Sequence, residues 1–380
     1  MTVDRRKICI VTSTRADWGL LSPLAKSLRD YGFDITVIAT NMHLLEETGM
    51  TVREIEADGF DPVRVPVSGR PDEIAAGVLT GFSDVFSASG FDAVIILGDR
   101  YEMVSAAMAA VLARIPIVHI AGGAVSYGAF DDCFRHAITK MAALHLTETD
   151  EYRRRIIQMG EHPSTVVTTG AIGVHNILNI PLMSREELEQ SLGFELGDNT
   201  LLVTMHAATL SSLSPSKQLD ALLRALHSVP DRRILFTYPN NDTDISKMVA
   251  LIEGYAMLHP DRVHVVPSLG RVRYLSALQY VEAVVGNSSS GLVEVPSAGI
   301  PTLDIGHRQD GRAHGPSVVR CGETAEEIEE GLRKALSPEQ KAIATRRENP
   351  YAKPDTLRLM TKAIAEADLS PRMQKKFYDL

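Results

Sequence analysis

The chain has 380 residues, 44% of them hydrophobic, so it can bury a large core and exceeds the size at which one core usually divides into two domains. Its formal net charge is −9 with both signs mixed along the chain, which excludes the basic stripe of a nucleic-acid-binding surface. Three cysteines are too few for a disulfide framework, and no Cys/His spacing suggests a metal site. No apolar run reaches the roughly 18 to 20 residues of a membrane span, so we expect a cytoplasmic protein without membrane contacts.

Short apolar runs alternate with longer helical patterns, which is typical of parallel sheets with helical crossovers. In the first half of the chain we expect strands at residues 8–12, 34–39, 63–66, 93–97, 117–120, 144–147 and 165–169. The helices expected there follow residue 17 as far as about residue 30, and then cover residues 70–87, 100–113 and 131–143.

A second cycle of the same kind begins after residue 180. It predicts strands at residues 201–204, 233–237, 263–266 and 283–285, and helices at residues 184–192, 215–229, 244–257, 271–281, 292–298 and 324–335. The fold class is therefore α/β, with two Rossmann-like domains, residues 1–178 and 179–355, facing a cleft. We expect a helical tail, residues 356–380, to pack back across the first domain.

Two polar segments follow expected strands of the first domain, at the sheet edge where open α/β proteins bind ligands. Residues 12–17 place hydroxyl groups and Arg15 at a helix N-terminus, which suits a phosphate group. Alternatively, Ser13 or Thr14 only caps the helix. At residues 97–102, Asp99 is a candidate acid or base beside an Arg100–Glu102 ion pair, or else an N-cap.

A third segment joins a Gly-Gly turn at residues 122–123 to the helix expected from residue 131. Asp131 and Arg135 are four residues apart, as are Asp132 and His136, so these side chains share a helix face. A salt-bridged surface helix is the ordinary explanation of such spacing. Apolar residues between them indicate a partly buried helix, which favours a functional site.

The fourth segment lies between a Val-rich strand and an amphipathic helix, where a simple Ser/Gly linker is not expected. Residues 287–291 offer backbone amides and three hydroxyl groups to a diphosphate, and Glu294 lies about one turn later, where it can bind ribose hydroxyls. His43 and His206 also follow strands. A lone histidine is usually structural, and only the neighbouring segments make these two candidates.

Seven stretches between residues 12 and 312 resemble the hydrolysing UDP-N-acetylglucosamine 2-epimerases of bacterial sialic acid biosynthesis. They are TSTRADWGLL, NMHL, GDRYE, GGAVSYGAFDD, RHAITK, GNSSSG and GIPTLDIGHRQDGR, in the family's order. The resemblance implies a GT-B-like fold, a homodimer or homotetramer, and no metal or nicotinamide cofactor. The implied reaction eliminates UDP from the UDP-sugar to give 2-acetamidoglucal, and then adds water with inversion at C2 to give N-acetylmannosamine.

The resemblance also implies roles for individual residues. Asp99 and Asp131 are the expected acid–base carboxylates, with His206 near the sugar and the leaving group. The expected substrate-binding residues are Arg15, His43, Arg135, His136, Asn287, Ser288, Ser289, Ser290, Gly291 and Glu294.

One position departs from the family pattern. The family has a glutamate directly after the paired glycines, where this chain has Ala124, and an alanine methyl group cannot transfer a proton. The loss of a positioned acid–base group costs about 10²–10⁴-fold in rate. A deliberate replacement, a natural relative with altered chemistry, and compensation by Asp131, Asp132 or Glu102 are all compatible with the sequence.

Several functions therefore compete. The leading hypothesis is a hydrolysing 2-epimerase acting on UDP-N-acetylglucosamine, and the nearest alternative applies the same chemistry to UDP-N,N′-diacetylbacillosamine. A glycosyltransferase shares the scaffold but needs an acceptor. A catalytically silent UDP-sugar-binding protein belongs to a different class, which the alanine at position 124 permits.

Overall fold

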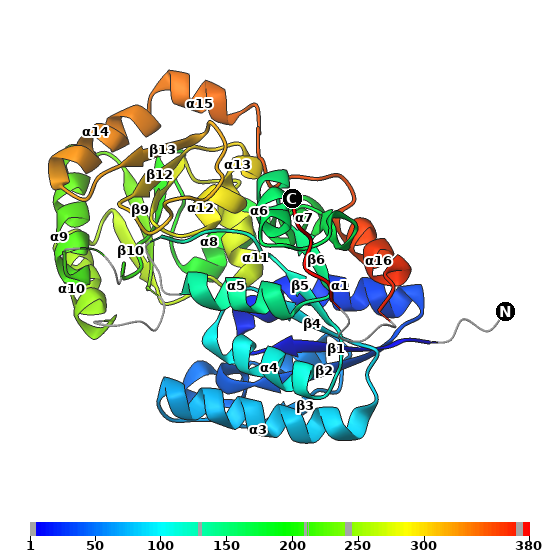
Figure 1. The fold of residues 1–380 in the computed structure, drawn as a ribbon. Helices are drawn as coiled ribbons and strands as arrows, with labels where there is room; N and C mark the ends of the chain where they lie inside the picture. Colours follow the sequence, from blue (N-terminus) through cyan, green and yellow to red (C-terminus); the bar gives the residue numbers. More distant parts are fainter. Residues whose placement is uncertain (1–4, 128–130, 209–210, 212, 240–244, 370–374) are drawn as a thin grey trace. The chain divides into compact units, whose positions relative to one another are not determined.

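The computed structural model describes residues 5–127, 131–208, 211, 213–239, 245–369 and 375–380 (Figure 1). The chain packs as two compact units. The first comprises Met1–Ala124, Phe130–His175 and Lys353–Leu380, and the second comprises Val125–Ala129 and Asn176–Ala352. The predicted divisions at residues 178 and 355 lie close to these limits. Among the described residues, no helix combines the length and the apolar character that crossing a membrane requires.

The first unit contains a seven-stranded parallel sheet of order β3-β2-β1-β4-β5-β6-β7. Its strands are β1 (Lys7–Thr12), β2 (Asp34–Thr40), β3 (Val63–Val65), β4 (Ala93–Leu97), β5 (Ile117–Ile120), β6 (Leu144–Thr147) and β7 (Val166–Thr168). Its helices are α1 (Arg15–Tyr31), α2 (Val52–Ala57), α3 (Pro71–Ser89), α4 (Tyr101–Leu112), α5 (Asp131–Met141), α6 (Asp150–Gln158) and α16 (Thr356–Glu366). Strand order reverses between β1 and β4, which marks the edge where such sheets bind ligands.

The second unit repeats this plan with six parallel strands of order β10-β9-β8-β11-β12-β13. They are β8 (Thr200–Thr204), β9 (Arg233–Thr237), β10 (Val263–Val266), β11 (Ala283–Gly286), β12 (Thr302–Ile305) and β13 (Val318–Cys321). Its helices are α8 (Arg185–Leu192), α9 (Pro215–Ala225), α10 (Ile245–Leu258), α11 (Gly270–Ala277), α12 (Ser290–Val293), α13 (Val295–Ala298), α14 (Ala325–Ala335) and α15 (Pro338–Ala344), while α7 (Ile172–Asn179) runs from the first unit into the second. The order reverses between β8 and β11.

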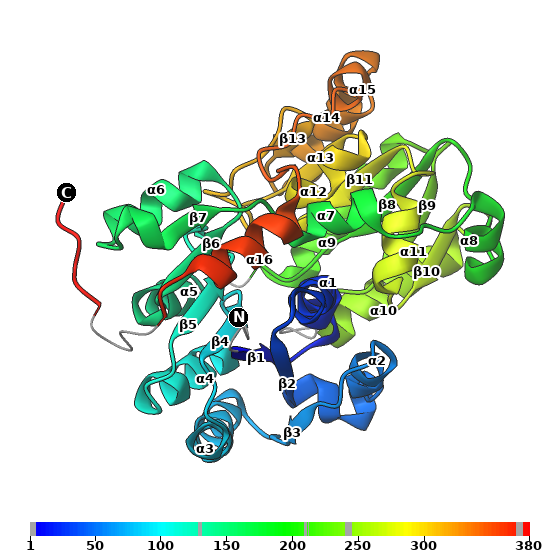
Figure 2. The same cartoon turned by 90° about the vertical axis from the view of Figure 1, so that its right-hand side faces the viewer.

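Helices cover both faces of the first sheet (Figures 1 and 2). On one face α1 and α16 pack against the sheet, with Trp18, Leu21 and Met360 in the same core cluster. On the other face α3, α4 and α5 bury Phe82, Ala106 and their neighbours in a second cluster. Strands covered on both sides read as continuous apolar runs, which is why the sequence indicated them.

Gly286 ends β11 at a point where the backbones of two strands approach closely. A Cβ atom at this position would lie 1.8 Å from the carbonyl oxygen of Thr204 on β8. Its φ of +139° also lies in a region that L-residues rarely adopt. Only glycine therefore fits, and the chain that follows it turns directly into residues 287–291.

The structure differs from the predicted elements in several places. Strands β12 and β13 and helices α2, α6, α7 and α15 were not predicted. The helix predicted at residues 292–298 is interrupted at Glu294, because Pro296 has no amide hydrogen with which to continue the helical ladder. In the predicted helical tail, the described residues form helix α16, which ends at Glu366, and residues 375–380 are not helical.

Candidate functional site

In the first unit, the loop after β1 caps helix α1. The Thr14 side chain accepts a hydrogen bond from the Asp17 amide at 3.2 Å, and the Asp17 carboxylate accepts one from the Thr14 amide at 3.0 Å. Thr14 therefore has the capping role that the sequence left open. Arg15 follows it on the first turn of α1 with an exposed side chain, so the proposal that Arg15 binds phosphate stands beside the cap.

A buried charged network lies at the carboxyl ends of β1, β2 and β4. Arg100 Nε donates to Glu102 Oε1 at 2.6 Å, which confirms the predicted ion pair, and Asn41 Nδ2 donates to the same oxygen at 3.2 Å. The Glu102 side chain is completely buried, and its Oε2 has no hydrogen-bond partner among the described residues. Burial raises the pKa of the Asp17 carboxyl group, whereas the nearby Arg100 opposes that shift.

Arg135, on α5, links the loop after β4 to the loop after β5. Its guanidinium group is 1% exposed and donates to Asp99, to Asp132 Oδ1 at 2.6 Å and to the carbonyl oxygen of Ala124 at 3.0 Å. Burial by itself lowers the pKa of Arg135, but the carboxylates of Asp99 and Asp132 more than offset this, so the pKa is raised. Arg135 is thus a fixed cation that orients Asp99.

Arg135 forms ion pairs with Asp132, three residues earlier on α5, and with Asp99. The sequence indicated Asp131, four residues earlier, as a residue on the same helix face, and gave no signal for these two contacts. His136 Nε2 lies 3.4 Å from Asp132 Oδ2, as the four-residue spacing indicated, and its Nδ1 is buried without a hydrogen-bond partner among the described residues. Asp131 begins α5 with a partly exposed side chain.

His119 on β5 supports the same edge, although sequence reasoning gave it no role. Its Nε2 lies 2.8 Å from the carbonyl oxygen of Gly98, and its Nδ1 lies 3.3 Å from Thr139 Oγ1. Burial lowers the pKa of His119 to about 3, so the ring is neutral at physiological pH. A Cβ atom at Gly122 would lie 2.8 Å from His119 Nδ1, which explains the glycine. His119 therefore fixes the backbone that carries Asp99.

The assignment of His43 to substrate binding needs correction. The ring is completely buried, with Nε2 at 2.9 Å from Thr12 Oγ1 and Nδ1 at 2.9 Å from Thr51 Oγ1. Burial lowers the pKa of His43 to about 4. Since both ring nitrogens are used inside the unit, His43 holds the loops after β1 and β2 together and offers nothing to a ligand.

In the second unit, the side chain of Asn287 is also used by the fold. Its Oδ1 accepts from the His206 amide at 2.7 Å, and its Nδ2 donates to the His206 carbonyl oxygen at 2.9 Å. Arg308 and Gln309 donate in turn to the Asn287 carbonyl oxygen, at 3.1 and 2.8 Å. The Asn287 side chain is therefore not available to a ligand, and a role of this residue in substrate binding would have to come from its backbone. This residue positions His206.

His206 follows β8 and is 7% exposed. Burial, and then the positive charge of Arg308, lower the pKa of His206 to about 3. The ring is therefore a neutral imidazole at physiological pH. A bound anion would raise this pKa, because it would stabilise the protonated form.

The serine cluster leads from β11 into α12. Ser288, Ser289 and Ser290 are each partly exposed, whereas Gly291 is buried with its Cα against Thr302. Tyr274 Oη lies 2.6 Å from Ser290 Oγ, and burial raises the pKa of this tyrosine, with the charge of Glu294 acting in the same direction. Tyr274 thus lies near both Ser290 and Glu294. The sequence gave no signal for it, because the contact joins separate helices.

Each unit therefore carries a polar cluster at the strand-order reversal of its own sheet. The first consists of Asp99, Asp131, Arg135 and His136 with Arg15 on the adjacent loop, and the second of His206, Ser288–Ser290 and Glu294. Within the described residues, no group of three His, Cys, Asp or Glu side chains is placed to hold a metal ion.

Comparison with known proteins shows the family to which the chain is similar. The family model of UDP-N-acetylglucosamine 2-epimerases matches residues 26–365. The chain is 34% identical over 385 residues to polysialic acid biosynthesis protein P7 of Escherichia coli, covering 99% of this chain and 98% of that protein. It is also 34% identical over 324 residues to the hydrolyzing GDP/UDP-N,N′-diacetylbacillosamine 2-epimerase of Campylobacter jejuni, covering 83% of this chain and 84% of that protein.

Solved structures agree on the fold. The UDP-GlcNAc 2-epimerase of Neisseria meningitidis bound to UDP-GlcNAc superposes with a TM-score of 0.81 at 16% identity, over 95% of this chain and 100% of that one. The Listeria monocytogenes structure described as a UDP-N-acetylglucosamine 2-epimerase gives 0.80 at 19% identity and covers both chains completely. The α/β fold with two parallel sheets is thus GT-B-like, as predicted.

Proposed function

Because the chain belongs to the UDP-N-acetylglucosamine 2-epimerase family, we propose that it is a hydrolysing 2-epimerase that converts UDP-N-acetylglucosamine to UDP and N-acetylmannosamine. The hydrolysing chemistry rests on relatives of 34% identity, two of which are named as hydrolyzing 2-epimerases. The observation that carries the proposal is the buried Arg135, which binds Asp99 and Asp132 beside the Ala124 carbonyl.

The polar cluster of the first unit supplies the groups that transfer protons. A carboxylate of the Asp99/Asp131 pair removes the proton from C2 while the bond between C1 and the UDP oxygen breaks, which forms the C1–C2 double bond of 2-acetamidoglucal. The other carboxyl group of the pair is protonated at this stage and gives its proton to the opposite face of C2, while water adds its hydroxyl group to C1. The proton that water loses restores this carboxyl group, and the first residue releases the original C2 proton to solvent. Arg135 orients Asp99 through their ion pair, and a proton-transfer group must be held in position in this way.

The polar cluster of the second unit binds the leaving group. We assign the diphosphate to the hydroxyl groups and amides of Ser288–Ser290, and the ribose hydroxyls to Glu294. Such donors stabilise the negative charge that develops on UDP as it departs. His206 begins as a neutral imidazole, and the incoming diphosphate raises its pKa, so that His206 gains the ability to donate a proton to the leaving oxygen.

The same residues suit a second substrate. Relatives from Campylobacter jejuni and Legionella pneumophila, each 34% identical, are named for UDP-N,N′-diacetylbacillosamine. This sugar has the same UDP leaving group and the same 2-acetamido group, so the chemistry carries over unchanged. The choice between the two donors depends on groups facing C4 and C6.

Incubation of the full chain with each donor tests the proposal. We expect UDP release in water alone, without any acceptor, together with the 2-epimeric free sugar. Release that depends on an added acceptor would favour a glycosyltransferase. Calorimetry that shows UDP binding, with no release from either donor, would contradict the proposal and support a silent UDP-sugar-binding protein.

A further inference from the structure

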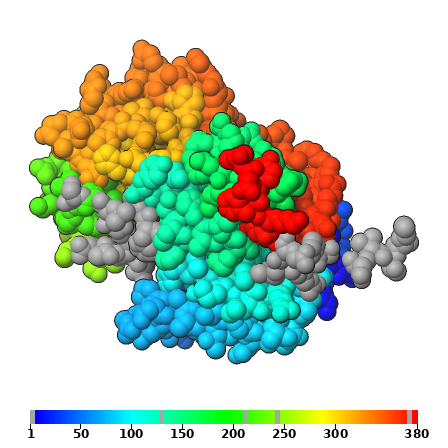
Figure 3. Space-filling view, in the orientation of Figure 1, coloured from blue at the N-terminus to red at the C-terminus, as the bar shows by residue number. Residues whose placement is uncertain are grey.

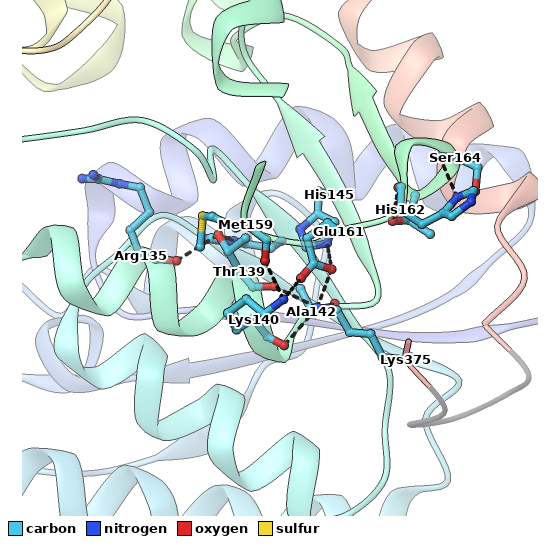
Figure 4. Close-up of polar contacts among 12 residues, drawn as sticks. Arg135, Thr139, Lys140, Ala142, His145, Met159, Glu161, His162, Ser164 and Lys375 are labelled. Carbon is cyan, nitrogen blue, oxygen red and sulfur yellow. Dashed lines mark hydrogen bonds and ion pairs between the residues drawn. The ribbon is translucent and has the colours of Figure 1, made fainter. Parts of the chain in front are cut away.

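A second polar cluster of the first unit lies at the C-terminal end of α5 (Figure 4). The carboxylate of Glu161, 1% exposed, is bound by Lys140 Nζ at 2.5 Å, by Lys375 Nζ at 2.6 Å and by His145 Nε2 at 3.1 Å. Burial by itself raises the pKa of Glu161, but the three partners more than offset this and lower it to about 2. Glu161 is thus a buried anion, and Lys375 is one of its two cationic partners.

Lys375 also caps the helix. Its ammonium group donates to the carbonyl oxygens of Ala142 at 2.7 Å, Lys140 at 2.9 Å and Thr139 at 3.2 Å. The last carbonyl groups of a helix have no partners within it, and a cation there also interacts favourably with the helix dipole. The Lys375 side chain therefore binds three carbonyl groups at the C-terminal end of α5.

Neighbouring contacts hold the same C-terminal segment, residues 375–380, against the first unit. The Tyr378 amide donates to the Gly160 carbonyl oxygen at 2.9 Å, and Lys140 Nζ lies 4.9 Å from the centre of the Phe377 ring. A Cβ atom at Gly160 would lie 2.3 Å from that ring, so the glycine makes room for it. In the space-filling view these residues, drawn in red, lie on the surface against the green part of the chain (Figure 3).

The capped end of α5 is connected to the acid–base residues at its other end. Thr139 Oγ1 donates to the Arg135 carbonyl oxygen at 3.0 Å and lies 3.3 Å from His119. In Figure 4 the guanidinium group of Arg135 points away from the Glu161 cluster, and it is this group that binds Asp99. Movement of the helix end therefore shifts both supports of Asp99, namely Arg135 and His119.

We propose that Lys375 is a positioning residue that fixes α5, and with it Arg135 and Asp99, for the reaction. The effect on rate rests on the proposed function, whereas the effect on α5 does not. The ammonium group of Lys375 binds the ionised carboxylate of Glu161 and, at the same time, three carbonyl groups at the C-terminal end of α5. Its removal loosens the helix without leaving Glu161 unpaired, because Lys140 and His145 remain.

The test compares three full-length variants with the unmodified chain. Lys375→Met keeps the length and apolar stem of the side chain but removes the charge, Lys375→Arg restores a cation, and Lys376→Met changes the exposed neighbouring lysine as a control. Two readouts are measured, namely hydrogen–deuterium exchange of residues 131–142 and the kcat and KM for UDP release.

For Lys375→Met we expect exchange in α5 to be about 10-fold faster and kcat to be about 10-fold lower. A displacement of catalytic groups by 1 Å lowers the rate about 100-fold, and we expect a smaller displacement here. The KM is expected to change less than about 2-fold, because the diphosphate is bound in the second unit. Lys375→Arg is expected to restore both readouts.

Unchanged exchange of α5 in Lys375→Met, equal changes in Lys376→Met, or a loss expressed only in KM would overturn the proposal. If the unmodified chain releases no UDP from either donor, the proposed function fails instead. The exchange of α5 alone then decides whether Lys375 fixes the helix.

Discussion

Asp99→Asn is expected to lower the rate of UDP release by about 10²–10⁴-fold, the usual cost of removing a positioned acid–base group. Asparagine keeps the size of the side chain and can still bond to Arg135 through its amide oxygen, but it can neither take up nor return a proton at C2. Because the diphosphate is bound elsewhere, KM is expected to stay within a few-fold of its original value. Steady-state kinetics of UDP release measure both quantities.

Asp132→Asn is the matched control, because Asp132 contacts the same guanidinium group at 2.6 Å. If Asp99 acts by proton transfer, the rate of UDP release by Asp132→Asn should fall only about 10-fold, because this change only weakens the orientation of Arg135. Equal losses in both variants would mean that the carboxylates only neutralise Arg135, and would remove Asp99 from the chemistry.

Ala124→Glu is expected to raise the rate of UDP release about 100-fold, at the lower end of what a proton-transfer group contributes. Ala124 is 5% exposed, and its carbonyl oxygen accepts from Arg135, so a carboxylate introduced here lies near a buried cation that keeps it ionised. The rate is measured with both donors, since the gain should appear with whichever donor the chain uses.

Ala124→Gln supplies the control, with the same added volume and no ability to transfer a proton. We expect Ala124→Glu to accelerate the release of UDP and Ala124→Gln to leave its rate unchanged. Equal rates in the alanine, glutamine and glutamate chains would show that Asp131, Asp132 or Glu102 already performs the transfer, and the prediction for residue 124 would then be wrong.

The sequence predicted the strands that consist of continuous apolar residues, but not β12 or β13. The physical reason is an ion pair between the two strands, in which Asp304 is buried and Arg320 is partly exposed. Asp304 on β12 and Arg320 on β13 are partners in the strand register, and Arg320 Nε lies 3.3 Å from Asp304 Oδ2. Charged residues that satisfy each other across a ladder break the apolar pattern by which a buried strand is predicted.

For the candidate site residues, the sequence indicated their position directly after a strand. It did not indicate whether their side chains bond within the fold or remain available to a ligand. Asn287 and His43 both follow strands, yet their polar atoms are bonded within the fold. Spacing along α5 indicated that Arg135 belongs to the site, but its contact with Asp99 joins residues 36 positions apart. Such contacts depend on the sheet order, which no local pattern contains.

The central claim is that this chain removes and returns a proton at C2 of a UDP-2-acetamido sugar. Proton NMR of the reaction run in heavy water measures it directly. We predict free sugar of inverted C2 configuration, with about one deuterium at C2, released together with UDP. Product that retains protium at C2, or UDP released with the original C2 configuration, would contradict elimination and re-addition.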